Sequence, residues 1–190
     1  MNKRSLLVIV CAFFVALNIS ATDTLKVRSK FIEQDSKSTL FKVGLNISTK
    51  YFGGLLYVKP ISDQSERIIF LSELGLKYFD FEHNKITNEI TVKYAMEYLN
   101  KKSLISLLKN DLLFLLNDYN IVEKRLKSDG VEIIKTTSNK FKRKINSDSS
   151  QKIIERGFLW PRRVLEIDGT SATLYHKSII RIKLQLRRIK

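Results

Sequence analysis

Two apolar, aromatic-rich runs separated by a polar turn fill the stretch Tyr51–His83. The first run reads YFGGLLYVKP, the turn reads ISDQSER, and the second run reads IIFLSELGLKYFDFEH. This arrangement is typical of paired antiparallel strands, and a glycine inside a strand marks a bend, a bulge or a close approach of two backbones. We therefore expect a sheet that curves at Gly53, Gly54 and Gly75.

Alternating apolar and polar residues predict further strands on both sides of this stretch. Residues 41–47 alternate before it, and residues 86–94 alternate after it with one apolar face of Ile86, Ile90, Val92 and Tyr94. Shorter runs predict strands at 131–135, 139–145, 152–159, 164–168 and 172–177. The last run, 178–189, has an apolar face and an almost wholly basic one. No strand–helix–strand alternation occurs, which disfavours a parallel sheet.

Near residues 100–117 the apolar period changes from two to that of a helix. Spacings of three, four and eight connect the apolar positions Leu104, Leu107, Leu108, Leu112, Leu115 and Leu116. The sequence thus predicts a mainly β protein with one principal helix (α+β). Its architecture would be a curved antiparallel sheet, or half-barrel, with a covering helix.

The first 21 residues have the three parts of a secretory signal peptide. Lys3 and Arg4 form a basic start, Leu6–Leu17 is an apolar run of 12 residues, and a polar break leads to the small residue Ala21. A membrane-spanning helix needs roughly 20 apolar residues, so this run is too short for a stable anchor. We expect export to the periplasm or cell envelope, cleavage near Ala21, and no integral membrane segment.

Cys11 is the one cysteine of the chain. Lipoprotein signals place a small residue before the lipidated cysteine, whereas here Val10 precedes it and the apolar run continues after it. We expect Cys11 to belong to the signal peptide, with lipidation as the alternative. Residues 22–190 would then form a single domain without a disulfide, stabilised by packing alone.

The formal net charge is +15, and loss of Lys3 and Arg4 with the signal peptide lowers it by two, to +13. Such a charge favours an anionic partner. Export disfavours nucleic acid and directs attention to an anionic membrane surface or cell-wall polymer. The alternative is that lysines and arginines only solvate the outer faces of strands.

Motifs that would indicate catalysis or metal binding are absent from the sequence. The two histidines are His83 and His176, and only His83 has carboxylates nearby, on Asp80 and Glu82. On a strand these two carboxylates point to one face and His83 to the other, so they do not converge. We expect no catalytic residue, metal ion or cofactor. The alternative is a hydrolase of a cell-surface polymer that uses Asp80 or Glu82.

The strands carry more large apolar residues than the surface of one helix can cover. Either a second layer packs on them or the sheet curls around a cavity suited to acyl chains. The residues expected to line this cavity are Phe70, Phe79, Phe81, Leu104, Leu107, Leu108 and Leu112. The alternative is an ordinary packed core.

The order of signal peptide, curved strands, helix and further strands resembles that of the LolA/LolB-like envelope proteins. YFGGLLYVKP looks like that group's aromatic-Gly-apolar strand, and GFLWPRRVLEID followed by IIRIKLQL looks like its closing strands. The resemblance covers most of residues 25–190. It implies an unclosed barrel covered by a helix, with an apolar cavity for lipid or for the acyl groups of lipoproteins. Without a lipidated cysteine the chain is closer to the LolA-like members.

Together these features predict an exported, non-catalytic carrier or chaperone that binds a lipid or an acylated protein. Arg181, Lys183 and Arg187 are expected to contact anionic head groups. A structural or interaction protein with a solid core and a protein-binding surface is the main alternative.

Overall fold

The computed structural model describes residues 26–28, 38–116, 118–128, 130–136, 140–145, 150–156 and 161–189. The predicted signal peptide (residues 1–21), its cleavage site near Ala21 and Cys11 lie outside these residues. Within the described part, no helix is both long and apolar enough to cross a membrane.

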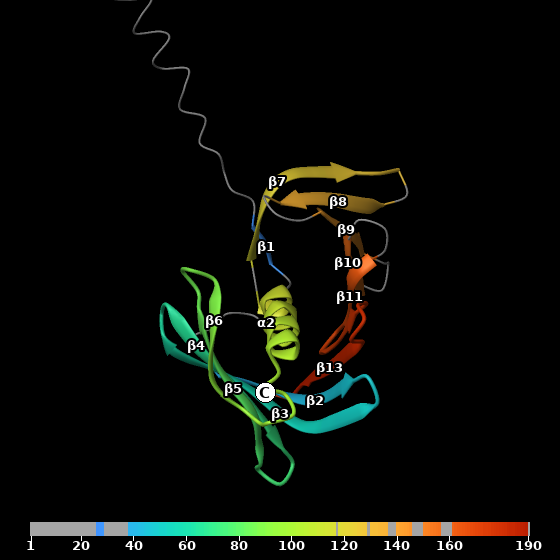
Figure 1. Cartoon of the computed structure of the whole chain (residues 1–190). Helices are drawn as coiled ribbons and strands as arrows, with labels where there is room; N and C mark the ends of the chain where they lie inside the picture. The colour runs from blue at the N-terminus through green and yellow to red at the C-terminus, as the bar shows by residue number, and fades with distance from the viewer. Residues whose placement is uncertain are drawn as a thin grey trace, which may run out of the picture.

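The described strands form one antiparallel sheet (Figure 1). Its order is β1-β7-β8-β9-β10-β11-β12-β13-β2-β3-β4-β5-β6, so β1 and β6 stand at its two ends and the sheet is open. The prediction of a mainly antiparallel β protein is confirmed. The strands are β1 (Lys26–Arg28), β2 (Thr39–Ile47), β3 (Lys50–Ser62), β4 (Ser65–Ser72), β5 (Lys77–Asn84), β6 (Glu89–Ala95), β7 (Asp118–Leu126), β8 (Val131–Thr136), β9 (Lys140–Ile145), β10 (Gln151–Arg156), β11 (Pro161–Asp168), β12 (Ser171–His176) and β13 (Ile182–Arg188).

Helix α2 (Lys102–Leu116) lies in the hollow of the curved sheet (Figure 1). It is the single helix in the described part of the chain, and its bounds agree with the prediction near 100–117. Its inward side is a row of buried leucines, Leu104, Leu108, Leu112 and Leu115. Burial of one leucine side chain contributes about 1.5–3 kcal/mol. Apolar packing therefore holds the helix against the sheet.

The last strand of the chain, β13, lies in the middle of the sheet beside β2. Leu184 pairs with Leu45 and Leu186 with Val43, and all four side chains are buried on the inner face. The alternation predicted for residues 41–47 is confirmed. The alternation predicted for 178–189 holds from Ile182 onward, because residues 178–180 form a bend.

The backbone of β4 comes very close to Gly54 on β3. A Cβ added there would lie 1.9 Å from the carbonyl oxygen of Leu71 on β4, far inside van der Waals contact. Only a residue without a side chain fits between β3 and β4 at this point. The predicted close approach is thus confirmed at Gly54.

Gly53 lies on the outer face, beneath the ring of an aromatic side chain. It pairs with Gly44 on β2, and the ring of Tyr51 lies across both glycines. A Cβ would meet that ring at 3.0 Å from Gly53 and at 3.1 Å from Gly44. An aromatic ring laid over paired glycines restores some of the packing that they lack.

Three details of the prediction are wrong. Gly75 does not interrupt a continuous strand, but lies at φ +81° in the turn between β4 and β5. Pro60, which cannot donate to the ladder and is therefore expected to end its strand, instead lies inside β3, which continues to Ser62 past a shift in register. Tyr94 does not share the inner face with Ile90, because an extra residue in β6 shifts the register and turns Tyr94 outward opposite Asp80.

The predicted position of Ile86 on that face is also wrong, and strand β7 has no counterpart among the predicted strands. Ile86 is exposed and lies in the turn before β6. β7 has the sequence DYNIVEKRL, in which apolar and polar residues do not alternate strictly. β7 pairs with its sequence neighbour β8 and with the distant strand β1, and periodicity does not detect the pairing with β1.

Asp80 is buried on the outer face and held by two cations. Arg67 donates to both of its oxygens, Nε to Oδ1 at 2.5 Å and Nη2 to Oδ2 at 3.0 Å, and Lys77 Nζ donates to Oδ2 at 2.9 Å. Burial by itself would raise the pKa of Asp80, but the hydrogen bonds from Arg67 and Lys77 outweigh it and hold the pKa below its ordinary value. The hydrogen bond to Asp80 correspondingly raises the pKa of Arg67.

Replacement of Gly54 by alanine should destabilise the fold strongly. The new methyl group would force β3 and β4 apart, at a cost of about 3 kcal/mol in the free energy of unfolding. Gly53→Ala is the matched control, because its methyl group meets only the ring of Tyr51, an exposed side chain that can rotate away. Urea unfolding should give a much lower midpoint for G54A than for G53A. Equal midpoints would contradict the close approach.

Asp80→Asn should change how stability depends on pH. Because the pKa of Asp80 is lower in the folded state, its carboxylate stabilises the fold above the unfolded pKa of about 4, and this contribution disappears as the pH falls through the folded pKa. At pH 7 we expect D80N to lose about 1–3 kcal/mol. Urea unfolding as a function of pH should show the difference from the parent shrink in acid.

Glu82→Gln provides the control on the same strand. Glu82 forms a partly exposed ion pair with Lys93 at 2.8 Å, and such pairs contribute at most about 1 kcal/mol. If D80N and E82Q had the same effect at every pH, Asp80 would not have the role assigned to it.

Candidate functional site

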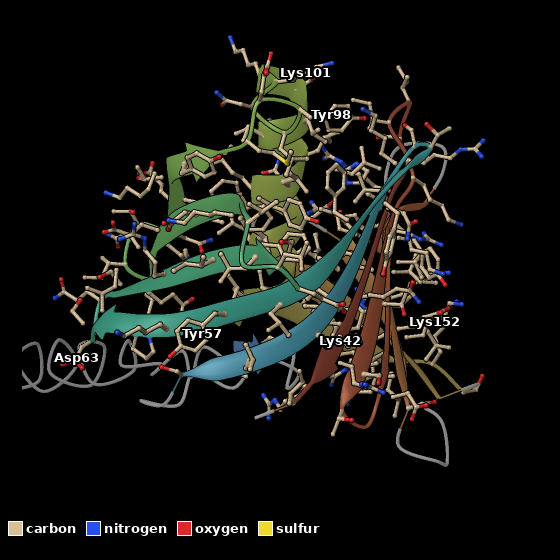
Figure 2. All side chains as sticks on the ribbon, turned by 90° about the horizontal axis from the view of Figure 1, so that it is seen from below. Lys42, Tyr57, Asp63, Tyr98, Lys101 and Lys152 are labelled. Carbon is tan, nitrogen blue, oxygen red and sulfur yellow. The ribbon has the colours of Figure 1, made fainter. Side chains whose placement is uncertain are left out.

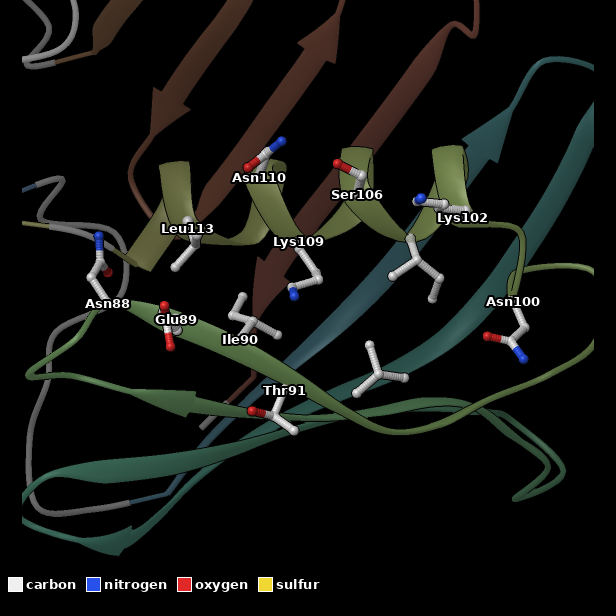
Figure 3. A pocket seen from close by; sticks show the side chains of 12 residues that line it. Asn88, Glu89, Ile90, Thr91, Asn100, Lys102, Ser106, Lys109, Asn110 and Leu113 are labelled. Carbon is white, nitrogen blue, oxygen red and sulfur yellow. The ribbon is translucent and has the colours of Figure 1, made fainter.

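A groove of about 890 Å³ lies between α2 and β6 (Figure 3). Its size falls within the range of ligand pockets in proteins, about 300–1,000 Å³. Figure 3 shows Lys109 and Leu113 pointing from the helix toward the strand, whereas Asn110 points away from it. The lining residues are Asn88, Glu89, Ile90, Thr91, Val92, Asn100, Lys102, Ile105, Ser106, Lys109, Asn110 and Leu113.

The groove exists because β6 is an end strand of the sheet. In the described chain β6 pairs with β5 on one side, and its other side has no strand beside it. Ile90 on β6 is buried, while Ile105 and Leu113 on α2 are only half-buried. The helix and the sheet therefore leave apolar surface between them that neither covers completely.

The groove combines this apolar surface with positive charge. Lys102 and Lys109 lie along its helix side, and Glu89 is its one lining carboxylate. Within the described residues neither lysine forms an ion pair, so their charge is available to a ligand. A site of this kind suits a molecule with an apolar chain and an anionic end.

The residues expected to line an open cavity instead form the packed core under the helix. Phe70, Phe79, Phe81, Leu104, Leu108 and Leu112 are buried, and Leu107 is half-buried. The space left among the helix and sheet side chains is about 10 Å³, which is about the room of one water molecule. In this conformation the core is therefore filled, and an acyl chain could reach these residues only if α2 moved.

The residues expected to contact head groups lie on the outer face of the sheet. Arg181 and Arg187 are exposed and Lys183 is half-buried, while their neighbours Ile182 and Leu184 point inward to the core. The alternation of side chains along β13 thus directs the cations away from both the groove and the core. Their expected role, contact with anionic head groups, stays a prediction, and on this face it would apply to a ligand or membrane outside the sheet.

A buried polar cluster joins α2 to the inner face of the sheet. Arg163 on β11 donates to both oxygens of Glu155 on β10, at 2.5 and 3.1 Å, and to the main-chain oxygen of Asn110 at 2.6 Å. Nδ1 of His176 on β12 lies 2.7 Å from Oδ1 of Asp111 on the helix. The second oxygen, Asp111 Oδ2, is buried and has no hydrogen-bond partner in the described structure.

A second buried group lies beside the groove. His83 on β5 is within hydrogen-bond distance of Glu66 through Nδ1, at 2.8 Å, and of Asn88 through Nε2, at 3.1 Å. Asn88 also lines the groove, so this group fixes the turn at one end of β6. Among the described residues no three side chains of the metal-ligating types gather as a metal site would require.

Neither polar group is among the sites predicted from the sequence. For the first group, however, the sequence does place Asp111 and His176 at inward positions. Asp111 is three residues after Leu108 and four before Leu115, so it falls on the inward side of the helix. His176 continues the inward phase of Ala172 and Leu174 on β12. A polar residue at an inward position needs a buried partner, because burial without a hydrogen bond is costly.

Glu155→Gln should destabilise the protein far more than an equivalent change on the outer face. It removes the closer of the two carboxylates that pair with the buried Arg163 and leaves only Asp111, at 3.8 Å; breaking a buried pair in this way costs about 3–5 kcal/mol. Glu166→Gln is the control, since Glu166 forms an exposed pair with Lys152 at 2.7 Å that contributes at most about 1 kcal/mol. Urea unfolding should separate the two variants. Similar losses would show that the buried cluster does not secure the helix.

No model of a protein family matches the sequence, and no curated protein matches it. The resemblance to the LolA/LolB-like proteins remains a prediction from the residue pattern. The functional argument rests on the geometry of the groove and of the filled core.

Proposed function

We propose that the protein is an exported carrier of the cell envelope that binds a lipid, or the acyl chain of a lipoprotein, without catalysing a reaction. The groove between α2 and β6 is the observation that carries this proposal. It is open, partly apolar and large enough for a chain molecule, and two lysines that form no ion pair with the described residues lie at its side.

In this proposal the open sheet is a half-barrel and α2 is its cover. The apolar part of the ligand lies over the half-buried Ile105 and Leu113, beside the buried Ile90. The anionic end lies near Lys102 and Lys109, where a lysine ammonium group replaces part of the water around its charge. Binding gains free energy mainly from burial, at about 25 cal/mol per Å² of apolar surface.

Deeper binding would require α2 to move away from the sheet. Such a movement would open the space between Leu108 or Leu112 and the sheet, but it would also break the contacts of Asp111 and Arg163 across the interface. The groove needs no such rearrangement. We therefore assign the first contact of the ligand to the groove.

The compartment and the partners follow from the N-terminal sequence and the charge. A signal peptide over residues 1–21, cleaved near Ala21, would deliver a protein of net charge +13 to the envelope, where anionic membrane surfaces and acylated proteins occur. Mass spectrometry of the secreted protein should give a mature N-terminus at residue 22. An uncleaved chain would contradict export by this route.

An interaction protein is the second candidate, and the filled core favours it. The free side of β6 would then accept an extended segment of a partner as an additional strand. Native mass spectrometry of gently purified protein distinguishes the two candidates. Co-purified lipid supports the carrier, whereas a lipid-free protein that also fails to bind a fluorescent fatty acid contradicts it.

The cations of the groove should recognise the charged end of the ligand. Replacement of both Lys102 and Lys109 by glutamine should weaken binding of a long-chain fatty acid about three- to tenfold, because an exposed charge pair contributes up to about 1 kcal/mol. Binding of the fatty alcohol of equal chain length should not change. Competition with a fluorescent fatty acid measures both affinities. An equal loss for the acid and the alcohol would contradict a head-group role.

The apolar surface of the groove should determine affinity for the chain. Leu113→Gln should lower fatty-acid affinity about tenfold, because each buried methylene contributes about 0.8 kcal/mol. Leu76→Gln is the control, since Leu76 is exposed in the turn between β4 and β5, outside the groove. If both variants bind like the parent, the ligand does not lie in the groove.

A further inference from the structure

A second pocket, of about 660 Å³, lies near the bend between β12 and β13; most of its lining belongs to the outer face of the sheet, with the inward-facing His176 and Ile182 among the rest. It shares no lining residue with the groove, and four strands separate β13 from β6 in the sheet. The two sites are therefore independent. The residues that line the outer pocket are Asn46, Ser48, Tyr175, His176, Lys177, Ser178, Arg181, Ile182 and Lys183.

The floor of this pocket is a row of side chains on three adjacent strands. Tyr175 on β12 pairs with Lys183 on β13, and Lys183 pairs with Asn46 on β2. Residues directly opposite on antiparallel strands have Cβ atoms about 4.5–5.5 Å apart, so the three side chains stand next to one another. Lys183 Nζ lies 5.6 Å from the centre of the Tyr175 ring. The sheet itself thus fixes the floor.

Three cations line this pocket, and no carboxylate in its lining neutralises them. Lys177 and Arg181 flank the bend at residues 178–180, and Lys183 belongs to the floor. No aspartate or glutamate lines the pocket, and in the described structure none of the three cations forms an ion pair. Like charges gathered in a concave site produce a strong positive potential that only an anion relieves.

The polar groups of the pocket fit the oxygens of a phosphate. Arg181 offers a planar set of donors that matches phosphate geometry, and lysines contribute point charges. The amide of Asn46 and the hydroxyl groups of Tyr175 and Ser48 can donate further hydrogen bonds. Charge-assisted hydrogen bonds of this kind are about twice as strong as neutral ones.

We propose that this outer pocket binds a phosphate-bearing anion, a phosphate monoester or diester, with Arg181 and Lys183 as the principal contacts. Arg187 does not belong to this site, because it lies four residues along β13, roughly 13 Å away at about 3.3 Å per residue, beside a different hollow. The proposal does not depend on the acyl-binding groove.

The phosphate could belong to a soluble molecule or to the head group of a phospholipid. Ile179, in the bend between Lys177 and Arg181, is fully exposed, with a relative accessibility of 103%. An exposed isoleucine between two cations would contact acyl chains if the phosphate came from a membrane. The same anion site serves both sources, so the experiment must separate them.

Arg181→Gln/Lys183→Gln tests the site. Isothermal titration with inorganic phosphate and flotation with phosphatidylglycerol vesicles give the two affinities of the purified protein. We expect saturable binding to at least one of these probes, and at least a tenfold loss in the double variant. Lys59→Gln/Lys127→Gln is the matched control, because it removes two exposed charges far from the pocket. Its affinities should stay within twofold of the parent.

Ile179→Ser separates the two sources. If the parent binds vesicles, a loss of vesicle binding in I179S with unchanged phosphate binding assigns the anion to a phospholipid. A parent that binds phosphate saturably but does not bind vesicles assigns it to a soluble phosphate; either result supports the site. Circular dichroism and thermal unfolding confirm that each variant is folded, and Arg181→Gln alone serves if the double variant is not. Absence of saturable binding to both probes, or an equal loss in the K59Q/K127Q control, would overturn the proposal.

Discussion

The fold depends on the burial of the inner face of the sheet by α2. An open sheet with an apolar concave face exposes that face unless another element covers it, and large exposed apolar patches promote association. The leucine row of α2 packs against strands from both halves of the chain, including Leu45 on β2 and Leu184 on β13. The helix thus holds together a sheet whose central pair, β13 and β2, comes from opposite ends of the sequence.

The buried polar cluster fixes the rotation of α2 about its axis, which apolar packing alone does not fix. Leucines could cover the inner face in several rotations of the helix, because the hydrophobic effect is not directional. The hydrogen bond between His176 and Asp111 and the one from Arg163 to the main chain of Asn110 select one rotation. In that rotation Lys109 and Leu113 face β6 and create the groove (Figure 3).

The aromatic and basic side chains Tyr98 and Lys101 lie together at the N-terminal end of the helix (Figure 2).

Periodicity predicts which face a residue occupies, but not which distant strands meet. The alternation in residues 41–47 and the leucine spacing of the helix identify the core correctly, whereas the pairing of β13 with β2 is not visible in either segment. The same alternation correctly places Lys183 on the basic outer face of the last strand. His176 appears partnerless in sequence because Asp111 is 65 residues away. The groove itself depends on the rotation of α2, which no local pattern specifies.

The most direct test of the central claim is to locate a bound acyl chain on the protein. A fatty acid that carries a nitroxide on its chain broadens the methyl resonances of nearby residues in solution NMR spectra. The account predicts selective broadening at Ile90, Ile105 and Leu113, with the outer-face methyl groups of Leu55 unaffected. Broadening at Leu55, or uniform broadening over the surface, would contradict binding in the groove.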